Sequence, residues 1–171
     1  DNHPANVRPV PPPGIVLTTA RQQGLRDAVS HIRREVASIK ELPETDAHQI
    51  LVLARAIEMT IDHSMFYSDA EVAMADKVND LALQRITAAK EGKRGMALLG
   101  VQENSDKQQW IVGGFRSKLD GSLQPFGIVV PPHWKSDKPL RMDVWLHGRD
   151  EKTSEVGFLH RRMTQAGEFT P

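Results

Sequence analysis

The fold class of this chain is set by the stretch GFRSKLDGSLQPFGIVVP at residues 114–131. Asp120-Gly121 is a strong turn signal, and strand-like residues flank it on both sides. We expect one strand over Trp110–Phe115 and a returning strand over Phe126–Val130, which Pro131 closes because proline lacks an amide donor. The stretch therefore predicts a β-hairpin.

A second informative segment, LRMDVWL at residues 140–146, lies downstream of the hairpin. Leu140, Met142, Val144 and Leu146 alternate with Arg141, Asp143 and Trp145, which is the period of a strand with one apolar face. We therefore expect a third strand at Leu140–Leu146. It would run directly into His147-Gly148-Arg149.

The N-terminal half of the chain reads as helices. Apolar residues recur at spacings of three and four over three segments, with Pro43 and Gly92 as stops. Ser68 to Glu71 has the pattern of a capping box. The expected helices cover residues 18–42, 44–63 and 68–92, and a further one begins near Ser154 and reaches Met163. The predicted class is α+β, a three-helix lobe followed by strands.

Composition excludes several classes of protein. The 22 Lys and Arg residues equal the 22 Asp and Glu residues, so the chain lacks the basic excess that nucleic acid attracts. It contains no cysteine, which rules out disulfides and a thiol nucleophile. No apolar run approaches the roughly 18 residues that a membrane span needs. We thus expect neither a nucleic-acid partner nor a membrane span.

His147-Gly148-Arg149 is the sharpest candidate for chemistry. Acyl transfer builds negative charge on a carbonyl oxygen, and each amide aimed at that oxygen typically contributes about 2.7–4 kcal/mol. Glycine after a strand lets the backbone approach closely enough to aim such amides. On the dipeptide alone, a strand-ending turn with a structural His147 is the favoured interpretation, because short motifs recur by chance.

The sequence offers less support for a metal site, a carboxylate pair or a cofactor site. The remaining histidines have no metal-ligand spacing, and the carboxylates lie where helix electrostatics favour acids. Phosphate-loop and dinucleotide-binding patterns are missing from the sequence. We expect no cofactor and no metal.

The surrounding residues strengthen the oxyanion interpretation. The pattern from Ser117 through DGS, QPFG and Pro131, followed by LRMDVWLHGR and then Ser154-Glu155, resembles the prolyl-oligopeptidase-like α/β-hydrolases. More narrowly, it is similar to a subgroup of uncharacterised, often secreted bacterial members. The resemblance is densest over residues 113–171.

This resemblance implies a serine esterase or peptidase with a Ser/His/Asp triad that acts on an ester- or peptide-containing substrate. His147, Gly148 and Arg149 match its oxyanion loop, with the amide of Arg149 or its neighbour as donor. The G-x-S-x-G nucleophile segment does not occur in residues 1–171. We expect this segment alone to be inactive and to need the remainder of the hydrolase domain, from the same or a second polypeptide.

The domain organisation expected from this resemblance has three parts. Residues 1–14 form a proline-rich arm, residues 15–94 a helical lobe, and residues 95–171 the N-terminal part of a hydrolase domain. The first residue is Asp1 rather than Met, which fits a secreted or periplasmic protein after signal removal.

A rival interpretation is a non-catalytic binding module with a helical bundle and a small β-domain. It predicts a closed antiparallel sheet over residues 114–149, whereas the hydrolase interpretation predicts an unpaired edge at Leu140–Leu146.

Overall fold

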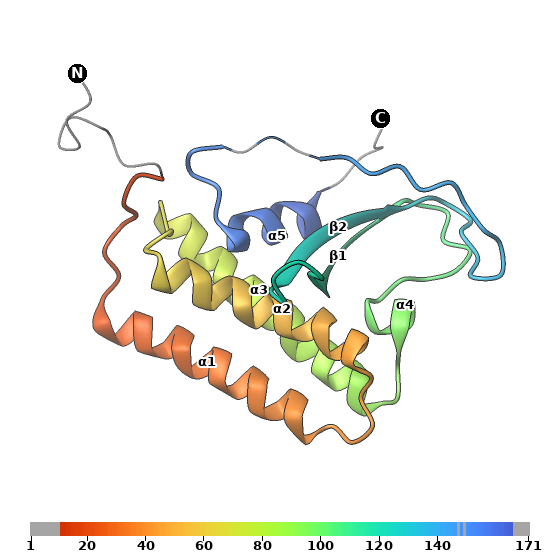
Figure 1. Cartoon of the computed structure of the whole chain (residues 1–171), viewed down its shortest axis with the longest axis horizontal. Coiled ribbons are helices and arrows are strands. Elements are labelled where there is room, and N and C mark those ends of the chain that lie inside the picture. Colours follow the sequence, from red (N-terminus) through yellow and green to blue (C-terminus); the bar gives the residue numbers. More distant parts are fainter. Residues whose placement is uncertain (1–10, 147, 149, 166–171) are drawn as a thin grey trace.

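The computed structural model describes residues 11–146, 148 and 150–165. The chain is α+β, as its sequence predicts: helices pack against one antiparallel hairpin (Figure 1). In chain order the elements are α1 (Thr19–Ser38), α2 (Glu44–Asp62), α3 (Asp69–Lys90), α4 (Gly95–Leu98), β1 (Gln109–Arg116), β2 (Leu123–Val130) and α5 (Glu155–Thr164).

Side-chain caps fix where three of the helices begin. Thr18 accepts a hydrogen bond from the Arg21 amide and starts α1, and Ser68 accepts one from the Glu71 amide and starts α3. The Glu71 carboxylate in turn accepts from the amide of Tyr67, one residue before the position of a standard capping box. Ser154 caps α5 in the same manner. These starts confirm the sequence prediction to within one residue.

The end of the first helix is earlier than predicted. The sequence pattern predicts a helix that reaches Leu42, but α1 ends at Ser38 and Ile39 is extended. Glu41 then adopts a positive φ of 54°, so the chain turns before Pro43 and α2 begins. The short apolar run after Gly95, whose type the sequence left open, forms the one-turn helix α4.

The hairpin pairs β1 with β2 in antiparallel register and packs on α2. Gly114 pairs with Pro125, and Val112, which is buried, pairs with Gly127. A Cβ atom at Gly114 would lie 2.5 Å from Cβ of Val52, so only glycine allows β1 to approach α2 this closely.

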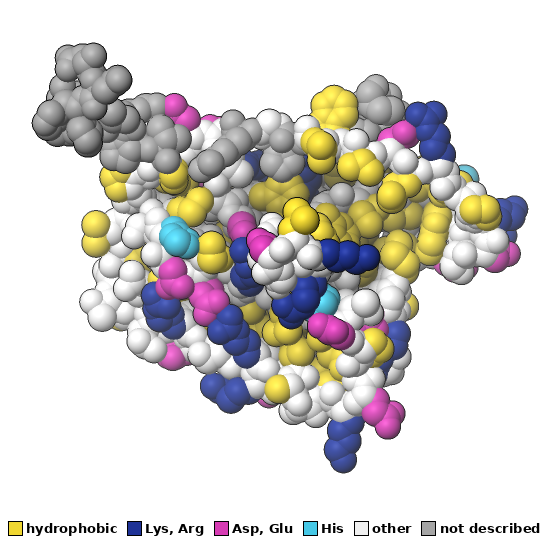
Figure 2. All heavy atoms as spheres, viewed as in Figure 1, with side chains coloured by type: hydrophobic (Ala, Val, Ile, Leu, Met, Phe, Trp, Pro, Cys, Tyr) yellow, Lys and Arg dark blue, Asp and Glu magenta, His cyan; other side chains and the backbone are white. Residues whose placement is uncertain are grey.

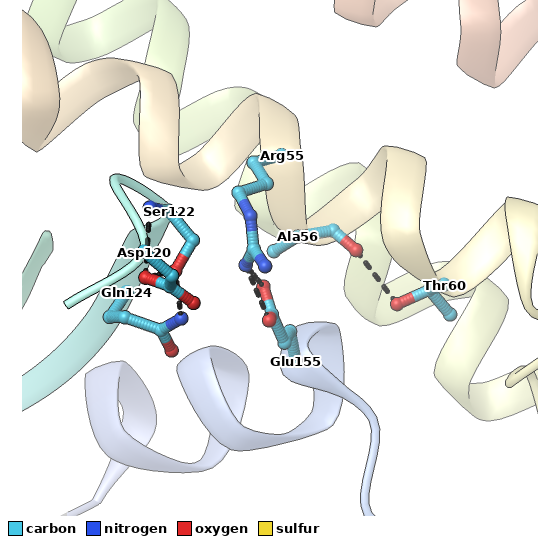
Figure 3. Close-up of polar contacts among 7 residues, drawn as sticks. All are labelled: Arg55, Ala56, Thr60, Asp120, Ser122, Gln124 and Glu155. Carbon is cyan, nitrogen blue, oxygen red and sulfur yellow. Dashed lines mark hydrogen bonds and ion pairs between the residues drawn. The ribbon is translucent and has the colours of Figure 1, made fainter. Parts of the chain in front are cut away.

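Helix α5 closes the fold against the same core. Val156 and Leu159 are fully buried and join the apolar cluster formed by α1, α2, α3 and β1. Arg55 of α2 donates two hydrogen bonds to the Glu155 carboxylate, at 2.5 and 2.7 Å (Figure 3). Both bonds come from Nη1, and because the ion pair is only partly exposed, it fixes the start of α5 over α2.

The segment Leu140–Leu146 is not a strand, which corrects the prediction. It is irregular and exposed, and among the described residues the only sheet is the two-stranded hairpin. Alternation alone does not make a strand, because strand hydrogen bonds need a neighbouring chain. The closed sheet over residues 114–149 that the rival interpretation predicted is likewise missing from the described part.

The turn of the hairpin contains an acid with a lowered pKa. The hydroxyl and amide of Ser122 donate hydrogen bonds to the Asp120 carboxylate, at 2.7 and 3.1 Å, and Gln124 donates to the same hydroxyl (Figure 3). The hydroxyl bond, followed by the amide bond, lowers the pKa of Asp120 from 3.8 to about 2.

We predict that Ser122→Ala raises the pKa of Asp120 towards 3.8, whereas Ser122→Thr keeps it low. A depressed carboxylate pKa stabilises the fold above the unfolded value of 3.8, and this contribution is lost as the pH falls through about 2. Titration of the Asp120 carboxyl carbon by NMR measures the shift. An unchanged pKa in Ser122→Ala would show that the hydroxyl bond does not form in solution.

Candidate functional site

The candidate site follows the segment Leu140–Leu146. Of its three predicted residues, His147 and Arg149 lie outside the described residues. Gly148 is exposed, and a Cβ atom added to it would meet nothing within 4 Å. The structure therefore leaves room for a second molecule or chain beside Gly148.

A shallow hollow of about 300 Å³ opens beside Gly148. Its walls come from the segment that precedes α5 and from α5 itself. They consist of Gly148, Asp150, Thr153, Phe158, Arg161, Arg162 and Gln165. Arg162 is held in place, because its guanidinium lies 5.9 Å from the Phe158 ring centre and donates to the Gln165 side chain. Glycine, mixed charges and an aromatic ring make a surface that can contact a polar chain, and none of the described residues that line the hollow is a histidine.

Large apolar side chains are exposed immediately before this hollow. Leu140, Met142, Val144, Trp145 and Leu146 are between 55% and 90% exposed. Figure 2 shows hydrophobic side chains gathered on the face where the hairpin and the loop after β2 lie. A run of exposed apolar residues in a folded chain marks a surface that another structure covers.

The described residues contain no assembled nucleophile. None of their serine hydroxyls donates a hydrogen bond to a histidine ring, and their His, Asp and Glu side chains form no group of three that would hold a metal ion. Ser154 is buried, and its Oγ accepts a hydrogen bond from the Gly157 amide. Its role is to cap α5.

Two residues that position the hairpin were missed by the sequence reasoning. The Gln49 amide bonds both backbone groups of Gly114, and the Arg85 guanidinium donates to the carbonyls of Gln49 and Val112, each at 2.6 Å. Burial lowers the pKa of Arg85 to about 10, so it stays charged at neutral pH. The sequence contained a signal for the burial of Arg85. This residue continues the apolar stripe of α3 at helical spacing after Val78 and Ala82.

Comparison of the chain with protein-family models, with curated proteins and with solved structures gave no match. In the described part, none of the helices has the length and apolar character needed to cross a bilayer. The hydrolase resemblance therefore rests on the sequence residues quoted above alone.

Proposed function

We propose that this chain is the N-terminal portion of a serine hydrolase that cleaves an ester or peptide bond. The observation that carries the proposal is the alternating apolar segment Leu140–Leu146, which leads into His147-Gly148-Arg149 in the sequence and is irregular and exposed, without a strand partner in the described part. Its alternation is that of a sheet strand, and its exposure is that of a strand whose neighbours come from elsewhere.

The free energy of burying apolar side chains favours a partner that covers Leu140–Leu146. Burying one large apolar side chain contributes about 1.5–3 kcal/mol of stabilisation. Burial of the apolar residues of this segment in a hydrolase sheet would therefore contribute several kcal/mol that the exposed segment lacks. In such a sheet the loop after Leu146 would lie at the strand end, where backbone amides can face a substrate carbonyl.

The mechanism assigns a limited role to this chain. The backbone amide of Arg149 or its neighbour would donate to the oxyanion, and Gly148 would let the backbone approach it. The serine that attacks the carbonyl and the histidine that accepts its proton would come from the remainder of the domain, because no G-x-S-x-G occurs in residues 1–171.

Labelling with a fluorophosphonate, which reacts with activated serines, tests the proposal. We expect label on a serine outside residues 1–171, in a polypeptide that contains or accompanies this chain, and none on the isolated chain. Intact-mass measurement and sequencing of the labelled material identify the serine. Labelling of the purified 171-residue chain, or its hydrolysis of an acyl ester, would contradict the assignment.

In the complete hydrolase, Arg149→Pro is expected to lower kcat by about 100-fold, because it deletes the amide that faces the oxyanion. Arg149→Ala keeps that amide and serves as the matched control, with kcat close to that of the unmodified enzyme. Equal kcat values for the two variants would exclude the Arg149 amide as the donor.

A second candidate function is a non-catalytic interaction module. It is favoured by the single apolar core that α1, α2, α3, β1 and α5 share among the described residues. In that case Leu140–Leu146 would be the docking segment. Absence of fluorophosphonate label from every polypeptide that contains this chain would favour this candidate over the hydrolase.

A further inference from the structure

The turn between β1 and β2 contains a chemically labile pair of residues. Asp120-Gly121 is the only place in the chain where a glycine follows an aspartate or an asparagine. Both residues are exposed, and Gly121 has a positive φ of 71°. Because glycine carries no Cβ, nothing on the residue itself hinders its backbone nitrogen from approaching the preceding side chain. The turn therefore presents the pair in this chain that is most open to a spontaneous change of its backbone.

The reaction open to such a pair is isomerisation of the aspartate. The backbone nitrogen of Gly121 would attack Cγ of Asp120, and the carboxyl OH would leave with the amide proton as water, which closes a five-membered succinimide. Water then opens the ring at one of its two carbonyls. One route restores aspartate, and the other gives isoaspartate, in which the main chain runs through the former side chain and is one methylene longer. The water released in the first step is taken up in the second, so no co-reactant is needed.

The turn holds the carboxyl group in its unreactive form. An ionised carboxylate repels the attacking electron pair and has no OH to lose, so ring closure needs the neutral carboxyl. The Asp120 carboxylate accepts hydrogen bonds from Oγ and from the backbone amide of Ser122, at 2.7 and 3.1 Å (Figure 3). These bonds, that from Oγ first, lower the pKa of Asp120 to about 2. At any pH well above this value, almost all of the carboxyl is ionised.

The attacking nitrogen is held as well. The amide of Gly121 donates to the carbonyl of Ser117 at 3.0 Å, and the carbonyl of Gly121 accepts from Arg116 at 2.7 Å. The amide of Ser117 donates to the carbonyl of Ser122 at 2.8 Å, so the two ends of the turn are joined. Ring closure would require the Gly121 nitrogen to leave its acceptor and move onto Cγ of Asp120. The hydrogen bonds of the turn oppose that movement.

We propose that Asp120-Gly121 is a latent isomerisation site, which the hydrogen bonds of the hairpin turn keep as aspartate while the chain is folded. The inference uses the turn alone and is independent of the proposed hydrolase function. Unfolding would free both reacting groups at once, so isoaspartate at position 120 would mark chains that have spent time unfolded. The longer backbone would also displace the carboxylate from Ser122, so a marked chain could not rebuild the same turn.

Incubation of the folded chain at pH 5 and 37 °C, beside the same chain unfolded in urea, tests the proposal. Trypsin cleaves after Lys118 and Lys135, and the peptide 119–135 contains Asp120 as its only aspartate and no asparagine. Electron-transfer fragmentation of this peptide distinguishes isoaspartate from aspartate, which have equal mass. We expect isoaspartate to form at least about tenfold more slowly in the folded chain, because a pKa lowered from 3.8 to about 2 alone reduces the neutral fraction about 60-fold.

Two variants of Ser122 identify the bonds responsible. Ser122→Ala removes the hydroxyl bond and leaves both reacting residues in place. In the folded variant isoaspartate should form about tenfold faster than in the folded unmodified chain, which corresponds to a rise of about one pKa unit. Ser122→Thr keeps a hydroxyl and is the matched control, with a rate close to that of the unmodified chain. Circular dichroism shows that each variant is folded during the incubation.

Equal rates of isomerisation in the folded and the urea-unfolded chain would overturn the proposal. An unchanged rate in folded Ser122→Ala would overturn it too, because the carboxylate would then not be held by the hydroxyl. Should Ser122→Ala not fold, the two rates of the unmodified chain decide alone. Either result leaves the fluorophosphonate experiment unaffected, so failure here is distinct from failure of the hydrolase assignment.

Discussion

Replacing Arg85 with alanine is expected to lower the free energy of unfolding by about 4 kcal/mol. Arg85 is 3% exposed and joins three elements, because its side chain extends from α3 and donates to carbonyls of α2 and β1. Alanine would leave a cavity, and it would leave the buried carbonyl of Val112 without the donor that closes the β1 edge.

Arg85→Met separates the two causes. Methionine fills most of the volume but supplies no donor, so we expect a loss of about 2 kcal/mol, which is the cost of the orphaned carbonyl and the lost charge-assisted bonds. Urea unfolding, followed by circular dichroism, measures both variants. A methionine variant as stable as the unmodified chain would mean that the cost of burying the Arg85 charge cancels everything that its hydrogen bonds contribute.

The sequence predicted the helical part well because helix signals are local. Thr18, Ser68 and Ser154 each place a side-chain oxygen where it meets an amide three residues on, and this geometry needs no other part of the chain. The early end of α1 has no such local signal: Ile39 is extended, and Glu41 adopts a positive φ although it is not a glycine.

Strand prediction succeeded for the hairpin and failed for Leu140–Leu146 for one reason. Asp120-Gly121 brings β1 and β2 together through a short local turn, so each strand has a partner close in sequence. Leu140–Leu146 has the same alternation but no partner within the described part. The alternation of its side chains indicates which face a strand would bury. Whether a neighbouring strand is present depends on residues far away in the sequence.

The candidate site was predictable only in part. Its position after an apolar alternating segment came from local pattern. The hydrogen bonds of Gln49 with Gly114 and of Arg85 with Val112, which close one hairpin edge, join residues 65 and 27 positions apart in sequence. Contacts between residues this far apart in sequence form only when the chain folds, so no local sequence pattern predicts them. They also cover the β1 edge of the hairpin, which no local pattern in the sequence indicates.

Gly114→Ala is expected to lower the free energy of unfolding by about 3 kcal/mol, at the upper end of overpacking effects. The added Cβ would lie 2.5 Å from Cβ of Val52 and 2.9 Å from the backbone oxygen of His48. The second atom belongs to the helix itself, so no side-chain rotation relieves the clash. Strand β1 would have to move away from α2, which would also lengthen the two hydrogen bonds between Gly114 and the Gln49 side chain.

Gly24→Ala is the matched control, because it makes the same chemical change in an open site. A Cβ atom at Gly24, inside α1, meets nothing within 4 Å. Alanine costs less conformational entropy than glycine in a helix, so this variant should gain about 0.5–1 kcal/mol. Opposite signs for the two variants in parallel urea titrations would locate the effect in the α2–β1 contact. A Gly114→Ala variant as stable as the unmodified chain would mean that the hairpin does not pack on α2 at this distance, and the closed β1 edge inferred from Gln49 would be wrong with it.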